Sequence, residues 1–147
     1  MAFLLLKISQ ESNFFTFQVN VFAMEIKRHI LVVDDEISTL ALVCQLLEKL
    51  GYHTTSASSG DEALSYLKEN DRIDFVLTDI NMPKMDGWEL TIRIKAIYPK
   101  LPIIAMTGES PAIVIPRLHN DGISGALFKP FKTHQLIEAI SNVLEFA

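Results

Sequence analysis

The sequence predicts an α/β protein in which a doubly wound parallel sheet is covered by helices on both faces. From residue 29 onward, short apolar runs alternate with segments whose apolar residues recur every three or four positions. This alternation is typical of βα units, and the chain carries five of them. Right-handed crossovers leave few topologies for such units. At 147 residues, a single domain with one hydrophobic core is expected.

The expected strands are short apolar runs. They cover residues 29–33, 52–56, 74–79, 103–107 and 126–128. Most of these runs are rich in Ile, Val, Leu or Phe, which is typical of strands that are buried on both faces of a parallel sheet.

The expected helices follow these strands in turn. The first carries Leu40, Val43, Leu47 and Leu50 and ends at Gly51, the second covers residues 61–69, the third follows Gly87 and ends before Pro99, the fourth lies within residues 111–121, and the fifth follows Thr133. Pro116 lacks an amide hydrogen, so we expect it in the first turn of its helix and not in the middle. Thr133 is the expected N-cap of the last helix.

Polar side chains stand at the ends of four expected strands. Asp34 and Asp35 follow the first strand, Asp79 ends the third, Thr107 ends the fourth, and Lys129 follows the fifth. Because the carboxyl ends of parallel strands meet at one edge of a sheet, these side chains are expected to lie close together. Carboxylates, a hydroxyl and an ammonium at one edge indicate a site for a divalent cation and a phosphoryl group.

Mg²⁺ is the cation that this set of residues favours. Two ionised carboxylates about 5 Å apart repel by roughly 3 kcal/mol at an effective dielectric constant near 20, so the cluster must take up protons or a cation. Mg²⁺ binds one or two carboxylates, keeps several waters and bridges to phosphate oxygens. Taken singly, Asp34 is explained as a helix cap and Asp79 as a strand end, but the whole set is not. The Lys129-Pro130 peptide bond is a candidate for the cis form.

Four stretches of the chain resemble the response regulator receiver domain of two-component signalling. They are residues 31–36 (LVVDDE), residues 77–87 (LTDINMPKMDG), the pair Thr107-Gly108, and residues 128–131 (FKPF). Each motif is short, but all four occur in the family's order at the spacing of βα units. The resemblance covers roughly residues 26–146, and we expect a receiver domain at residues 25–147.

The resemblance implies a flavodoxin-like fold with strand order 2-1-3-4-5. It implies that a histidine kinase or a phosphotransfer protein phosphorylates Asp79, and that Lys129 and Thr107 contact the phosphoryl oxygens. The protein would be a signalling protein and not an enzyme, although it would assist its own phosphorylation and dephosphorylation. It would signal to a downstream protein partner through the last two strands and helices.

The resemblance also implies a set of metal ligands. Asp35 and Asp79 would hold Mg²⁺ through their side chains, Asn81 through its backbone carbonyl, and Asp34 through water. One departure from the family concerns the signal: the position three residues before Lys129, often Tyr or Phe, is Ala126. We therefore expect ordinary phosphorylation chemistry with an unusual output.

Residues 1–24 are expected to be an extension of uncertain status. The alternation of apolar and polar residues from Phe15 to Val21 predicts a strand, while Met24 offers an alternative start of the protein. Because the final helix reaches the last residue, we expect a stand-alone single-domain regulator. The alternative is a receiver that belongs to a longer regulator or a hybrid kinase.

Composition narrows the function further. The net charge of −5 argues against nucleic-acid binding as the main role, and no apolar stretch reaches the roughly 20 residues that span a bilayer. A single cysteine, Cys44, fits a reducing cytosol, so a cytoplasmic protein is expected. The four histidines show no zinc-binding spacing.

Two other functions fit the sequence less well than a receiver domain does. A haloacid dehalogenase-type phosphohydrolase requires an acid two residues after its nucleophile, and here that position is Asn81, whose amide cannot supply a proton. A nucleotide- or flavin-binding module requires a glycine-rich loop after the first strand, and here that position holds Asp34, Asp35 and Glu36.

Overall fold

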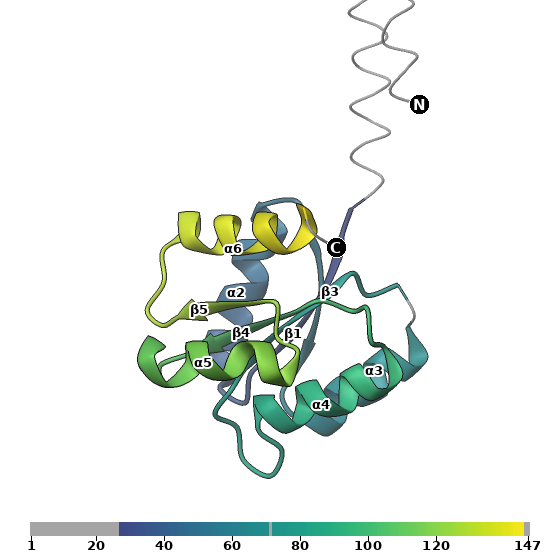
Figure 1. Ribbon diagram of the computed structural model, residues 1–147. Helices are drawn as coiled ribbons and strands as arrows, with labels where there is room; N and C mark the ends of the chain where they lie inside the picture. Colours follow the sequence, from purple (N-terminus) through teal and green to yellow (C-terminus); the bar gives the residue numbers. More distant parts are fainter. Residues whose placement is uncertain (1–26, 71, 146–147) are drawn as a thin grey trace, which may run out of the picture.

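The computed structural model describes residues 27–70 and 72–145. The strands form one parallel sheet in the order β2-β1-β3-β4-β5, the flavodoxin-like order that the sequence resemblance implies (Figure 1). They are β1 (His29–Val33), β2 (His53–Ala57), β3 (Phe75–Asp79), β4 (Ile103–Thr107) and β5 (Gly125–Phe128). The predicted α/β fold class is therefore confirmed.

Helices cover both faces of this sheet (Figure 1). α2 (Ile37–Lys49) and α6 (Thr133–Glu145) pack on one face, and α3 (Gly60–Glu69), α4 (Gly87–Ile97) and α5 (Pro111–Asp121) pack on the other. Successive side chains of β1 point to opposite faces, so Leu31 and Val33 pack under the second group and Ile30 and Val32 under the first. Within the described residues, no helix is long and apolar enough to cross a membrane.

Several elements begin or end one residue away from the prediction. β2 is shifted by one residue, and α3 and β5 each start one residue earlier, at Gly60 and Gly125. β3 starts at Phe75, one residue later than predicted, and the carboxylate of Asp74 just before it accepts a hydrogen bond from the backbone N–H of His29 at 2.7 Å. The predicted strand within residues 1–24 lies outside the described residues.

The prediction for Pro116 is wrong, because this residue lies inside α5. Ser110 is the N-cap, with its hydroxyl accepting from the N–H of Ala112, and Pro111 is the proline of the first turn. The helix continues through Pro116 because it buries Val114 completely against the core, and this packing offsets the lost backbone hydrogen bond.

The prediction that Thr133 is the N-cap of α6 is also wrong, because Thr133 is the first helical residue. At this end of the helix the side chain of Gln135 accepts a hydrogen bond from the backbone N–H of Lys132 at 2.7 Å. The side chain of Gln135 thus reaches back to the amide of Lys132, the residue just before the helix, as the third residue of a capping box does.

The loop between β3 and α4 contains the one non-glycine residue with positive φ in the described part of the chain, Lys84, at 66°. Side chains with a Cβ pay about 1 kcal/mol or more in this region, and asparagine pays less. We expect Lys84→Asn to raise the free energy of unfolding by about 0.5 kcal/mol, as measured by urea denaturation. Lys100→Asn, an exposed lysine without positive φ, is the control. An equal gain in both variants would contradict this explanation.

Candidate functional site

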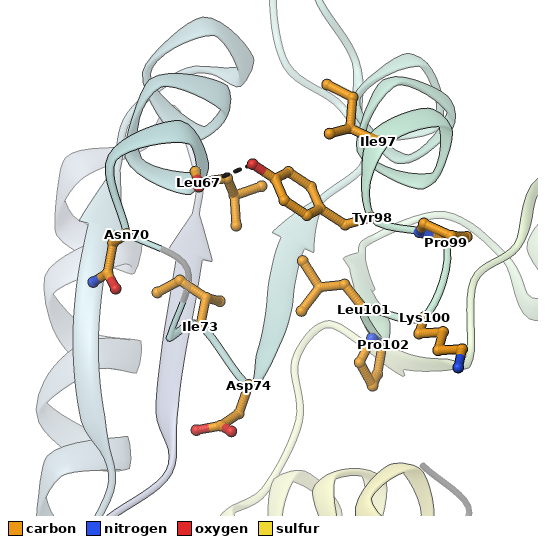
Figure 2. Close-up of a pocket in the computed structure, with 10 residues that line it drawn as sticks. All are labelled: Leu67, Asn70, Ile73, Asp74, Ile97, Tyr98, Pro99, Lys100, Leu101 and Pro102. Atoms are coloured by element: carbon orange, nitrogen blue, oxygen red, sulfur yellow. Dashed lines mark hydrogen bonds between the residues drawn. The ribbon is translucent and has the colours of Figure 1, made fainter.

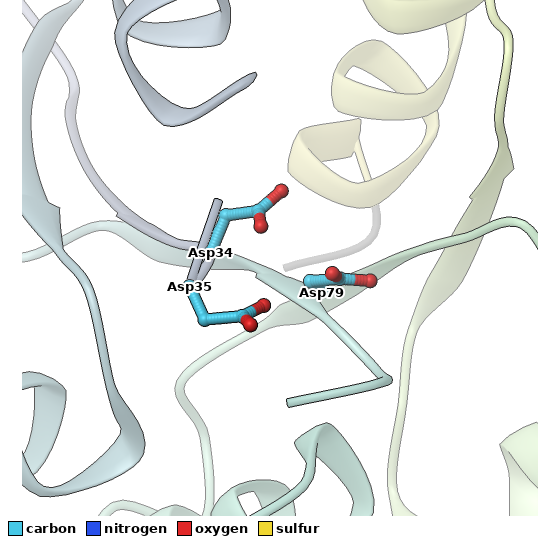
Figure 3. Close-up of side chains that lie close together, drawn as sticks. All are labelled: Asp34, Asp35 and Asp79. Carbon is cyan, nitrogen blue, oxygen red and sulfur yellow. The ribbon is translucent and has the colours of Figure 1, made fainter. Parts of the chain in front are cut away.

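Three carboxylates meet at the carboxyl-end edge of the sheet. Asp34 and Asp35 directly follow β1, and Asp79 is the last residue of the neighbouring strand β3. One oxygen of each carboxylate lies within 4.8 Å of the others, and Figure 3 shows the side chains converging. Among the residues that the structure describes, this is the one cluster of three or more acids, histidines or cysteines that can share a metal ion. Sequence order and strand adjacency together build this cluster.

The three acids differ in their surroundings. Asp34 is fully buried, and its Oδ1 accepts a hydrogen bond from the backbone N–H of Glu36 at 2.9 Å. Asp79 is 8% exposed, and its Oδ1 accepts from the backbone N–H of Ile80 at 2.8 Å. Asp35 is exposed. The cluster is therefore buried on one side and open to solvent on the other.

Lys129 supplies the positive charge of this cluster. Its Nζ lies 3.1 Å from Oδ2 of Asp34 and 3.4 Å from Oδ2 of Asp79, and its side chain is 26% exposed. Burial opposes the charged form of Lys129, but the hydrogen bond to Asp34 and the charge of Asp79 outweigh burial and raise the pKa of the ammonium. The Lys129-Pro130 peptide bond is cis.

The surroundings of Asp79 disfavour the ionised form of its carboxyl group. Burial raises the pKa of Asp79; the nearby Lys129 ammonium reduces this rise, and the Asp34 carboxylate adds to it. The ionised form of Asp79 is therefore less stable in this site than in water, and a further cation at the open side of the cluster would stabilise it.

Thr107 and Asn81 lie beside the cluster without contacting it. Thr107 is fully buried at the end of β4, and its hydroxyl accepts a hydrogen bond from the backbone N–H of Glu109 at 3.0 Å. Its carbonyl accepts from the backbone N–H of Lys129 at 2.7 Å, which joins the ends of β4 and β5. Asn81 is exposed, two residues beyond Asp79. The structure thus brings the acids and Lys129 together, and leaves the Thr107 hydroxyl bonded to its own loop.

Sequence reasoning did not assign a role to Gly87, although this glycine fixes the backbone of the site. Its N–H donates a hydrogen bond to the carbonyl of Ile80 at 2.7 Å. A Cβ at this position would lie 2.4 Å from the carbonyl oxygen of Asp79, so no larger residue fits without moving the site. Asp86 caps α4 through the N–H of Glu89 at 2.8 Å. The signal was the Met-Asp-Gly sequence, which contains both residues.

A hollow of about 490 Å³ lies at the opposite edge of the sheet, where β3 and β4 begin (Figure 2). Its walls are largely apolar and include Leu67, Ile97 and Leu101. The one hydroxyl among its lining side chains, that of Tyr98, already donates to the carbonyl of Leu67 at 3.1 Å. This hollow lacks convergent chemical groups, so the carboxyl-end edge is the candidate site.

The comparison with protein families decides what this site belongs to. Residues 30–141 match the family model described as the response regulator receiver domain. The chain belongs to the response regulator receiver domain family. Receiver domains serve signalling and are not classical enzymes, and the matched residues include every member of the acid cluster and Lys129. The expected resemblance is therefore confirmed.

Relatives of this receiver domain occur in large sensor kinases. It is 42% identical over 101 residues to the sensor histidine kinase RcsC of Escherichia coli, a match that covers 69% of this chain and 10% of RcsC. It is 35% identical over 115 residues to the autoinducer 1 sensor kinase/phosphatase LuxN of Vibrio campbellii, covering 78% of this chain and 13% of LuxN. The chain thus spans about a tenth of the length of these curated relatives.

Solved structures of similar size share the fold of this receiver domain. A response regulator receiver domain protein from Clostridium thermocellum matches with a TM-score of 0.76 and 35% identity, covering 81% of this chain and 95% of that one. The chemotaxis protein CheY4 of Vibrio cholerae matches with a TM-score of 0.75 and 31% identity, covering 80% and 99% of the two chains.

The donor set of this receiver domain fits a small, hard divalent cation. All three acids offer carboxylate oxygens within 4.8 Å of one another, and Mg²⁺ prefers oxygen ligands. The described residues provide no histidine or cysteine in this cluster, which disfavours softer metals. The exposed position of Asp35 leaves room for the waters that Mg²⁺ retains.

Proposed function

We propose that this receiver domain accepts a phosphoryl group on Asp79 from a histidine kinase or a histidine phosphotransfer protein. The observation that carries the proposal is the position of the Asp79 carboxylate. It is almost buried at the edge of the sheet, with two further carboxylates beside it and the ammonium of Lys129 at 3.4 Å. A carboxylate beside a cation site and a fixed ammonium is arranged to attack a phosphoryl group and to neutralise the charge that develops.

The residues divide the work of the transfer. An oxygen of Asp79 bonds to phosphorus as the bond between phosphorus and the donor breaks, and the donor leaves with the electron pair. Asp35 and Asp79 would hold Mg²⁺ by their side chains, Asn81 by its carbonyl and Asp34 through water. When bound, Mg²⁺ would neutralise charge on the phosphoryl oxygens. Asp34 is already held in orientation by the N–H of Glu36.

Lys129 and Thr107 are proposed to contact the phosphoryl oxygens. The ammonium of Lys129 already bridges two carboxylates, so it is in place for a third anionic group. The Thr107 hydroxyl oxygen accepts from the Glu109 N–H, so its own O–H is free to donate to a phosphoryl oxygen, and this bond would draw the loop after β4 toward the site. That loop leads directly into α5, so the last two strands and helices are the proposed surface for a downstream protein partner.

We also propose that the protein acts as a single-domain regulator, with a receiver inside a longer regulator or hybrid kinase as the alternative. The match to the chemotaxis protein CheY4, which covers 99% of that chain, supports the first form, and the matches to the sensor kinases support the second. Immunoblotting of the native protein separates them. A band of the size of 147 residues is expected, and a much larger band would establish the alternative.

Incubation of the full chain with acetyl phosphate and MgCl₂, followed by intact mass measurement, tests the proposed function. We expect a gain of one phosphoryl group, which disappears when EDTA replaces MgCl₂ and when hydroxylamine is added, because hydroxylamine cleaves acyl phosphates. A gain that survives both treatments would place the phosphoryl group on another kind of residue. Steady turnover of a small phosphate ester would favour the phosphohydrolase instead.

A further inference from the structure

Trp88, the only tryptophan of the chain, contacts α5 from the start of α4. It follows Gly87 in the first turn of α4 and is 6% exposed. The guanidinium carbon of Arg117, in α5, lies 4.2 Å from the centroid of a Trp88 ring. This distance is within the range of a cation–π interaction. The side chain of Arg117 is thus a direct link between two helices that are far apart in sequence.

The stack is held from the α5 side. The Nε of Arg117 donates to Oδ2 of Asp121, one turn later in the same helix, at 2.6 Å. Because Asp121 fixes the guanidinium, the plane of Arg117 is oriented by its own helix before it meets Trp88. Val114, the fully buried residue of α5, belongs to the same apolar cluster as Trp88. Movement of the indole therefore acts on α5 through the stacked guanidinium of Arg117.

On the side of the acid cluster, Trp88 lies next to the backbone of Asp79. Gly87, the residue before it, has no space for a Cβ beside the Asp79 carbonyl, and its N–H bonds to the Ile80 carbonyl at 2.7 Å. The first turn of α4 thus packs against the backbone of Asp79, which carries the proposed phosphoryl group, and of Ile80. A shift of this backbone on phosphorylation has to move the start of α4, and the indole with it.

A second route by which a change at the site could reach α5, through a side chain of β5 that follows Thr107, is weak in this chain. Ala126 stands where a larger side chain would be needed to follow the movement of Thr107, and a methyl group offers little contact. We propose that the Arg117–Trp88 stack, held by Asp121, carries a change at Asp79 to helix α5. This inference rests on the proposed phosphorylation of Asp79, and it assigns Arg117 and Trp88 a role in the output and not in the chemistry.

The test measures amide hydrogen exchange of residues 111–121 before and after phosphorylation with acetyl phosphate and MgCl₂. In the wild-type protein, we expect phosphorylation to change exchange in α5 by about threefold or more, the size expected for coupling through a few contacts. In Arg117→Gln and in Asp121→Asn, this change should be lost, while exchange in residues 80–87 still responds. Acrylamide quenching of Trp88 emission should rise in Arg117→Gln without any phosphodonor, because the stacked cation is gone.

Arg93→Gln is the matched control. Arg93 bonds to Glu89 at 2.6 Å with the same spacing of four residues and a similar exposure, 53% against 51% for Arg117, but it belongs to α4 itself. It should keep the full response of α5. If Arg117→Gln gains a phosphoryl group and α5 responds as it does in Arg93→Gln, the stack is only packing and the inference is overturned. If the wild-type protein gains no phosphoryl group, the proposed function fails first and the inference fails with it.

Discussion

Replacement of Asp79 by asparagine is expected to abolish the phosphoryl gain from acetyl phosphate and, in the presence of EDTA, to stabilise the folded protein. The amide keeps the size of the side chain and can still accept the hydrogen bond from the Ile80 N–H. It cannot form an acyl phosphate, and it carries no charge to repel Asp34 and Asp35. Relief of the cost of burying this charge, and of its repulsion with Asp34, should raise the free energy of unfolding by about 1 kcal/mol, because Lys129 already offsets part of that cost.

The stabilisation expected for Asp79→Asn should depend on pH. Burial holds the pKa of Asp79 above its ordinary value, so the folded protein binds this proton more tightly than the unfolded chain does. The cost of ionising Asp79 is fully present above the folded-state pKa and vanishes as the pH falls below the unfolded-state value. The increase in the free energy of unfolding caused by Asp79→Asn should therefore be largest at neutral and alkaline pH and should shrink on acidification. Urea denaturation at a series of pH values measures it.

Asp61→Asn, which alters an exposed acid in the first turn of α3, is the control for both measurements. It should leave phosphoryl incorporation intact and change stability by only a few tenths of a kcal/mol. An equal phosphoryl gain in Asp79→Asn would place the acceptor on another residue. A loss of stability in Asp79→Asn would mean that the carboxylate is favoured in the site and not opposed by its neighbours.

The features that sequence predicts well here are those that local pattern determines. β3 ends in Asp79, and Asp34 directly follows β1, so the ends of the apolar runs alone predict that both acids lie at the same edge of the sheet. Strand adjacency then accounts for their separation: β1 and β3 are neighbours, and the carboxylates of both strands fall within 4.8 Å. The strand order itself came from the family resemblance and not from periodicity.

The features that sequence did not predict depend on distant contacts. Asp74 lies just outside β3, and its carboxylate accepts a hydrogen bond from the N–H of His29, 45 residues away. Pro116 is tolerated inside α5 because the helix is held by the core on which it packs, which propensity rules do not take into account. Arg117 and Trp88 are 29 positions apart and follow no periodic signal, so their stack appears only when α4 and α5 lie side by side. Long-range contact, and not local preference, decided each of these cases.

Replacement of Lys129 by methionine is expected to change metal binding and phosphoryl transfer in opposite directions. Without the ammonium, the three carboxylates keep their negative charge and no cation competes with the metal, so the affinity for Mg²⁺ should rise by about tenfold, or about 1.4 kcal/mol. Phosphoryl transfer should slow by about tenfold or more, because a fixed positive charge no longer neutralises the phosphoryl oxygens. Trp88 emission during MgCl₂ titration and intact mass against time give the two values.

The same variant should be less stable than the wild-type protein when EDTA is present, by about 3 kcal/mol, since Asp34 is left buried without its ammonium partner. Saturating MgCl₂ should recover most of this loss, because the cation takes over the neutralising role of Lys129. Lys132→Met, at an exposed lysine three residues further along, should show none of these effects. Weaker Mg²⁺ binding in Lys129→Met would mean that Lys129 organises the carboxylates for the metal and does not compete with it.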